Sequence, residues 1–213
     1  MNKRYTDGFT IIETMLFIAI SGMLVVTLLV GTGVALSFQR YRDSVQTLKS
    51  SIQGQYAEVM SVKNDRTNDW FCNESTETGQ DDLDGEDRGQ SSCVIIGRYI
   101  EIKGGTTATY TVLARDIGVA SEPSSDIEAL QTRYVYAAPD LYASTGYLEW
   151  STSIDWVAEG SDADSPPANI ERSIAILILR SPQSGQVYTF TSNTVPEEVT
   201  NGTIKQMIVA GDA

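Results

Sequence analysis

The feature that most constrains this chain is an uninterrupted apolar run near its N-terminus. Residues 14–38 contain no charged residue and no proline. A helix rises about 1.5 Å per residue, so this run of about 25 residues would be roughly 37 Å long. The hydrocarbon core of a bilayer is only about 30 Å thick. The run is therefore long enough to cross a membrane as a single helix.

A short motif precedes this run. The segment reads Asp7-Gly8-Phe9-Thr10-Ile11-Ile12-Glu13, and the polar leader before it carries the basic residues Lys3 and Arg4. The leader, the glycine, the aromatic residue after it, the spaced acid and the long apolar helix together resemble the type IV prepilin and type II secretion pseudopilin family. The resemblance covers about the first 30 residues.

The resemblance implies processing at named residues. A prepilin peptidase would cleave between Gly8 and Phe9 on the cytoplasmic side of the membrane, and the new Phe9 amine would be methylated. Glu13 would then be fifth in the processed chain. It would pair with the Phe9 amine of a neighbouring subunit, because two opposite charges attract more strongly as water leaves. The pair would set axial register more than it adds stability. Alternatively, Glu13 lies shallow enough to reach the headgroups.

Two simpler interpretations of the N-terminus are a signal anchor and a removed secretory signal. A secretory signal has an apolar core of roughly 7–15 residues, with small residues after it at the cleavage site. Here the apolar run is longer, and Gly8 precedes it. The prepilin interpretation is therefore favoured. The anchor remains the alternative, as an unprocessed single-span surface protein with a ligand-binding extracellular domain.

Beyond the run, apolar residues continue at three- and four-residue steps, which predicts an amphipathic continuation of the helix with one face against a partner. These residues are Phe38, Tyr41, Val45, Leu48, Ile52, Tyr56, Val59 and Met60. The resemblance implies a pilin-like α+β fold, in which one long N-terminal helix packs on an antiparallel β-sheet or on two small sheets. Where many family members carry a proline, this chain has Val30 beside Gly31-Thr32-Gly33. These glycines are interpreted as tolerated small residues, since glycine is common in membrane helices. The alternative is that they permit local unwinding or close helix approach.

The C-terminal part predicts β-strands. In the first expected strand, one face would carry Val94, Ile96, Ile100 and Ile102, although Arg98 interrupts it. Hairpins are expected over 94–113 and 173–191. Further strands are expected at 133–137, 147–150, 154–157 and 203–209, with a helical turn at 126–131. The predicted organisation is a leader at 1–8, a hydrophobic transmembrane or filament-core helix at 9–38, an amphipathic helix at 39–63 and a β-rich head at 64–213.

Cys72 and Cys93 are the only cysteines, and they bracket a polar loop. They predict a disulfide if the head faces an oxidising exterior, and otherwise two free thiols. Residues 81–87 of the loop are mostly acidic, and clustered carboxylates suit calcium. The segment does not fit the twelve-residue calcium loop, because Ser91 falls where the final glutamate should be. A solvated loop without metal is therefore favoured, and calcium stays open.

Composition narrows the function further. The chain has no histidine, which removes Ser-His-Asp and Cys-His catalysis, and no phosphate-binding P-loop pattern occurs. We therefore expect no enzyme and no cofactor. The formal net charge is −13, and it becomes −14 without residues 1–8. Such a charge argues against nucleic-acid binding and disfavours docking on an anionic membrane surface. Trp70, Trp150 and Trp156 are interpreted as core or rim packing residues in preference to a ligand platform.

The sequence thus predicts a structural subunit, of the minor pilin or pseudopilin kind, in a type IV pilus or type II secretion-like filament. The partners that the resemblance implies are other pilin subunits, a prepilin peptidase/methylase, an assembly ATPase, a platform protein and the membrane. The N-terminus would be cytoplasmic and the head outside the cytoplasmic membrane, with the subunit later in a cell-surface or periplasmic filament. The choice between pilus and pseudopilus stays open.

Overall fold

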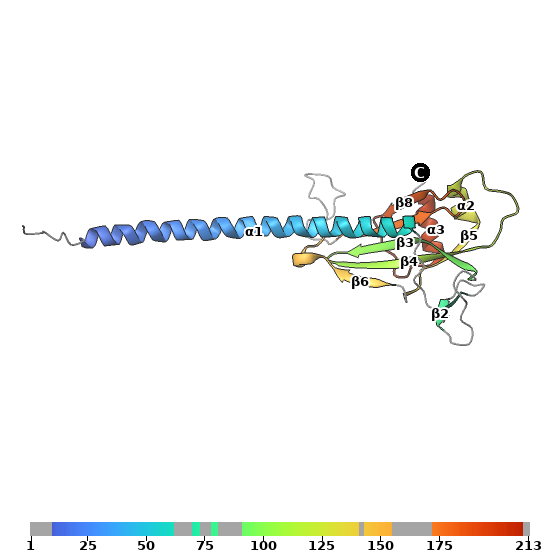
Figure 1. Ribbon diagram of the computed structural model, residues 1–213, viewed down its shortest axis with the longest axis horizontal. Coiled ribbons are helices and arrows are strands. Elements are labelled where there is room, and N and C mark those ends of the chain that lie inside the picture. The colour runs from blue at the N-terminus through green and yellow to red at the C-terminus, as the bar shows by residue number, and fades with distance from the viewer. Residues whose placement is uncertain are drawn as a thin grey trace, which may run out of the picture.

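The computed structural model shows an α+β chain in which a long helix projects from a β-sheet head (Figure 1). The structure describes residues 10–61, 70–72, 78–80, 91–140, 143–154 and 172–210. The long helix, α1 (Ile11–Ser61), has 51 residues and is therefore about 77 Å long. Its N-terminal half stands clear of the head, and its C-terminal half lies along the sheet. The predicted combination of a long N-terminal helix and an antiparallel sheet is confirmed.

Six strands form one antiparallel sheet in the order β5-β4-β3-β7-β8, and β6 also pairs with β4. They are β3 (Cys93–Lys103), β4 (Thr106–Asp116), β5 (Tyr134–Ala137), β6 (Ser144–Tyr147), β7 (Ser173–Arg180) and β8 (Val187–Ser192). A separate two-stranded ribbon joins β1 (Trp70–Cys72) to β2 (Thr78–Gln80). The two predicted hairpins, β3–β4 and β7–β8, are both present.

The sheet is covered on both faces. The C-terminal half of α1 packs on one face, while α2 (Asp126–Thr132) and α3 (Asn201–Ala210) pack on the other. Successive strand residues point to opposite faces. In β7, Leu177 accordingly joins the cluster beneath α2 and α3, whereas Ile178 joins the cluster beneath α1. Because both faces of β7 are buried, neither face needs polar residues, which explains the unbroken apolar run in its sequence.

A β-bulge in β3 changes which residues share a face. The pairing of β3 with β4 shifts between Ile95 and Gly97. Ile96 packs with Tyr99 in the cluster beneath α2 and α3, not with Ile100 beneath α1. The predicted face of Ile96 is therefore wrong, because the extra residue of a bulge resets the alternation of side chains.

The face of α1 that meets the sheet differs from the predicted apolar stripe. The least exposed side chains along this half of α1 are Ser44, Leu48, Ile52, Gln55 and Val59. The other members of the predicted stripe are exposed, namely Phe38, Tyr41, Val45, Tyr56 and Met60. The apolar residues of this segment extend over more of the helix than one sheet can cover. The stripe prediction is therefore right only for the three residues that contact the sheet cluster.

The strand predicted at 203–209 is wrong, because this segment forms helix α3. The Thr200 backbone N–H donates to Thr203 Oγ1 at 2.8 Å, and the Thr203 N–H donates to Thr200 Oγ1 at 3.4 Å. This exchange caps the first turn. Ile204, Met207 and Ile208 are buried at the three- and four-residue spacing that places side chains on one helix face.

The strand predicted at 147–150 is also wrong beyond its first residue. Tyr147 ends β6, and a 3-10 turn, η2 (Glu149–Ser151), follows. Trp150 has φ of 59° and Ser151 has φ of 54°, values that no extended strand adopts. Of the strand expected at 154–157, only Ile154 lies in the described part of the chain, and it is not in a strand there.

Candidate functional site: the exposed half of the long helix and the base of the head

The N-terminal half of α1 presents an apolar surface that the head does not cover. Between Ile11 and Phe38 every large apolar side chain is at least half exposed. An 18-residue window of α1 reaches a mean hydropathy of 2.3, and none of it is buried. By length and composition, α1 is the one helix in the described part of the chain that could cross a membrane. Burying this surface in lipid or among other helices would be strongly favourable.

The hydroxyl side chains within this apolar surface bond to their own helix. Ser21 Oγ donates to the Phe17 carbonyl at 2.6 Å, and Thr27 Oγ1 donates to the Leu24 carbonyl at 2.9 Å. Thr32 and Ser37 do the same five and ten residues after Thr27. A hydroxyl bonded to a preceding carbonyl needs no water. These residues therefore do not oppose burial of the helix in an apolar environment.

Glu13 takes part in a cap at the start of α1. The Thr10 N–H donates to Glu13 Oε2 at 3.4 Å, and the Glu13 N–H donates to Thr10 Oγ1 at 3.3 Å. This reciprocal pair is a capping box, and its Thr-x-x-Glu pattern was visible in the sequence. A carboxylate in the first turn also complements the positive end of the helix dipole. Glu13 thus has a local role in one chain, in addition to the intersubunit role expected of it.

The processing residues cannot be placed alongside this cap. Gly8 and Phe9 lie outside the described residues, which begin at Thr10.

Further along, α1 continues unbroken through Gly31 and Gly33, so the local unwinding considered for these glycines does not occur. A Cβ at either position would meet nothing within 4 Å. Being two residues apart, the glycines lie on different sides of the rod, and each leaves its own side without a side chain.

The base of the head is held against α1 where the apolar run ends. The guanidinium carbon of Arg40 lies 5.1 Å from the centre of the Trp150 ring, a cation–π contact. One turn later, the hydroxyls of Ser44 and Thr152 lie 2.5 Å apart. Trp150 nevertheless remains 56% exposed. Trp150 was expected to pack in the core or at the rim, and its ring packs against a helix residue at the edge of the head.

The backbone of η2 is strained at two adjacent residues. Trp150 and Ser151 both lie in the left-handed region, which non-glycine residues rarely adopt. Such conformations cost of the order of 1–3 kcal/mol each. They persist only where surrounding contacts hold them, and here Trp150 contacts Arg40 while the neighbouring Thr152 bonds to Ser44. Neither the strain nor the position of Trp150 had a signal in the sequence.

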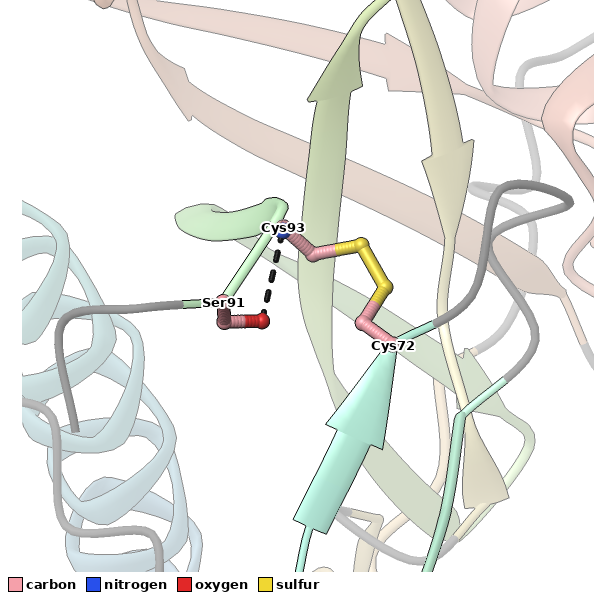
Figure 2. The surroundings of a disulfide bond; sticks show 3 residues. All are labelled: Cys72, Ser91 and Cys93. Carbon is pink, nitrogen blue, oxygen red and sulfur yellow. Dashed lines mark hydrogen bonds between the residues drawn. A yellow bond between two sulfur atoms is a disulfide. The ribbon is translucent and has the colours of Figure 1, made fainter. Parts of the chain in front are cut away.

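A disulfide joins Cys72 to Cys93, with the two Cα atoms 6.0 Å apart (Figure 2). It ties the end of β1 to the start of β3, and the Cys93 N–H donates to Ser91 Oγ at 3.3 Å. The predicted disulfide is therefore present. The acidic residues 81–87 lie outside the described part of the chain, so the calcium hypothesis for that loop remains a hypothesis. Among the residues described, no group of three or more potential metal ligands comes together.

The chain was compared with family models, with curated proteins and with solved structures, and nothing matches it.

Proposed function

We propose that this chain is a structural subunit, of the minor pilin or pseudopilin kind, of a type IV pilus or type II secretion-like filament. The observation that carries the proposal is the projecting half of α1, an apolar rod that the head leaves uncovered. Such a rod can be stored in a membrane as a single span. In a filament, the same surface is buried against the rods of neighbouring subunits, and the heads lie outside.

The position of Glu13 supports this proposal. It is the only charged residue in the described part of the chain before Arg40, and its carboxylate is exposed in the single chain. When rods pack together, this acid leaves water and requires a cationic partner. The Phe9 amine of a neighbouring subunit, freed by cleavage after Gly8, supplies one. A neighbour in the wrong register would leave both charges unpaired, so the pair selects one axial offset.

The proposal implies a set of partners. They are other subunits of the same filament, a prepilin peptidase/methylase that acts at Gly8 and Phe9, and an assembly ATPase and platform protein at the membrane. In this role the chain is a substrate of processing enzymes and not an enzyme. The disulfide fits a head that faces an oxidising compartment.

Intact mass of the membrane-extracted chain tests the processing step. The expected mature form lacks residues 1–8 and carries one added methyl group on Phe9. A Gly8→Asp variant is expected to keep the full mass. If the unsubstituted chain retains its leader and is recovered only as single anchored molecules, the alternative of an unprocessed surface protein with a ligand-binding head replaces the filament proposal.

Two substitutions of Glu13 separate its possible roles. Glutamine at this position preserves the capping pattern with Thr10 but removes the charge, whereas alanine removes both. If the charge sets register, Glu13→Gln and Glu13→Ala should both be inserted and processed yet be missing from sheared filaments. Thr10→Ala, which removes the hydroxyl that accepts from the Glu13 N–H and keeps the charge, is the matched control and should assemble. Assembly of Glu13→Gln at the normal level would contradict the register role.

A further inference from the structure

The base of the head carries two exposed aromatic side chains that α1 places beside a membrane surface. We propose that Trp150 and Tyr147 insert into the lipid headgroup region at the point where α1 leaves the bilayer, so that the head of the unassembled subunit rests on the membrane. This inference depends on one part of the proposed function, the membrane span, and not on filament assembly.

The depth of Trp150 follows from its contact with α1. Arg40 comes 27 residues after Glu13, which corresponds to about 40 Å along a helix. A bilayer with its headgroup regions is about 40–45 Å thick. With Glu13 at one interface, Arg40 therefore lies at the other. The Trp150 ring is 5.1 Å from the Arg40 guanidinium, so it lies at nearly the same depth.

The loop that carries these aromatic residues is fixed to the sheet. The Leu148 N–H donates to the Gly105 carbonyl at 2.8 Å, and the Ile154 N–H donates to the Gly104 carbonyl at 3.2 Å. These bonds attach the loop to the β3–β4 turn. In Figure 1, β6 points toward the N-terminal half of α1, so the loop after it lies at the end of the head nearest the span.

Exposure and side-chain type point to a lipid interface. Tyr147 is 84% exposed and Trp150 is 56% exposed. Tryptophan and tyrosine concentrate at membrane–water interfaces, because one end of each ring system is apolar and the other can hydrogen-bond. The left-handed backbone at Trp150 and Ser151 holds the indole outward against Arg40, where an extended strand would direct it differently.

The charges around this aromatic pair select the kind of lipid. Arg40 and Arg42 are balanced by Asp43 and Glu149, which are exposed on the same helix segment and in η2. Lys103 pairs with Glu101 beside the β3–β4 turn. The described charges near the aromatic pair are therefore mixed in sign, and the whole chain is acidic. We infer that docking relies on the aromatic side chains in a zwitterionic headgroup region. It should not require anionic lipid, and added salt should weaken it little.

Tryptophan fluorescence of the full chain in zwitterionic nanodiscs tests this inference. Trp70→Phe with Trp156→Phe leaves Trp150 as the reporter, and lipids spin-labelled at the headgroup act as quenchers. The matched control replaces all three tryptophans with phenylalanine and adds Val209→Trp, an exposed position on α3, a helix that lies farther from the N-terminal half of α1 than β6 does. Phe17→Trp in the same tryptophan-free background reports on the span, with lipids labelled deep in the acyl chains.

Headgroup quenching of Trp150 should exceed that of the Val209→Trp reporter by about threefold, and should persist between ~0.1 M and ~1 M salt. In the chain with all three tryptophans, Trp150→Phe should remove the quenched component. Equal quenching at Trp150 and the control, with the Phe17→Trp reporter quenched, overturns docking but keeps the span. Shielding of Trp150 from aqueous iodide without lipid quenching means that a second copy covers it, and also overturns docking. Failure of the Phe17→Trp reporter overturns the span and docking together.

Discussion

Arg98 Nη2 lies 2.8 Å from Glu58 Oε2, and this ion pair joins the middle of β3 to the C-terminal part of α1. Arg98 shares a sheet face with Ile100, which packs beneath α1. In the sequence Arg98 interrupts an otherwise apolar face, and the structure shows why it is tolerated there. Its guanidinium also donates to Thr111 Oγ1 on β4. The partly buried charge therefore has both an anionic partner and a hydrogen-bond acceptor.

Removing the Arg98 side chain should lower the free energy of unfolding more than removing the charge of Glu58. The Glu58 side chain is about half exposed, whereas the Arg98 side chain is 22% exposed. Glu58→Gln should lower the free energy of unfolding by less than about 1 kcal/mol, as for other solvent-exposed pairs. Arg98→Ala should cost roughly 1–2 kcal/mol, because it also removes a hydrogen bond and a packed aliphatic stem. Thermal unfolding of the full chain in detergent measures both.

Glu198→Gln, an exposed acid between β8 and α3, is the control and should be neutral. Equal costs for Glu58→Gln and Arg98→Ala would contradict the asymmetry.

Gly97 should tolerate no side chain. A Cβ at this position would lie 2.2 Å from the Ile178 carbonyl oxygen and 2.6 Å from Leu179 Cδ2. The carbonyl belongs to the β3–β7 ladder and cannot move without disturbing it. Gly97→Ala should therefore cost about 2–3 kcal/mol of stability. Gly54 on α1 meets nothing within 4 Å, so Gly54→Ala should stabilise by about 0.5–1 kcal/mol. Opposite signs in urea unfolding are expected, and a neutral Gly97→Ala would refute the close approach.

Two buried tyrosines should respond differently to loss of their hydroxyl. The Tyr136 hydroxyl donates to the Leu130 carbonyl. The Tyr99 hydroxyl is buried without a hydrogen-bond partner in the part of the chain that the structure describes. Tyr136→Phe should cost about 1 kcal/mol, and it leaves the carbonyl of Leu130 short of a donor. Tyr99→Phe should be neutral or stabilising by up to about 1 kcal/mol. A larger loss for Tyr99→Phe than for Tyr136→Phe would contradict this assignment.

Because of the same two tyrosines, the free energy of unfolding should fall at alkaline pH. Burial raises the pKa of Tyr136, and burial together with the nearby Glu101 carboxylate raises the pKa of Tyr99. An unfolded tyrosine loses its proton near pH 10. Above that pH the unfolded state releases protons that the folded state keeps, so the free energy of unfolding falls as pH rises. The stability of the unsubstituted chain, measured from pH 8 to about 11.5, should fall more steeply than that of Tyr99→Phe/Tyr136→Phe.

Substitutions in α3 distinguish a helix from the strand that the sequence suggested. Met207 and Ile208 are adjacent and both are buried, whereas Val209 is 57% exposed. Adjacent buried side chains are natural on a helix face against a sheet. Met207→Ala and Ile208→Ala should each cost about 2–4 kcal/mol, and Val209→Ala should cost less than about 0.5 kcal/mol. A strand with one covered face would instead make Met207 and Val209 behave alike, and equal costs for those two would argue against the helix.

Several elements were predictable because their causes are local. The hairpins follow from apolar strand residues around glycine-containing turns, at Gly104–Gly105 and at Gly185. The apolar run determines that α1 is a helix and that its N-terminal half can span a membrane. The Thr10 and Glu13 spacing determines its cap, although this was recognised only once the structure showed the bonds. The two cysteines determined their own pairing, since no other thiol exists.

The tertiary structure decided what depends on neighbours far away in the chain. The segment of α3 is rich in β-branched residues and has helical spacing as well, and packing on the sheet beside α2 selects the helix. The bulge before Gly97 decides the face of Ile96. The docking of η2 decides that Trp150 lies over Arg40, more than a hundred residues earlier. Local propensities carry a fraction of a kilocalorie per residue, whereas burial of one large side chain carries about 1.5–3 kcal/mol, so packing prevails wherever the two compete.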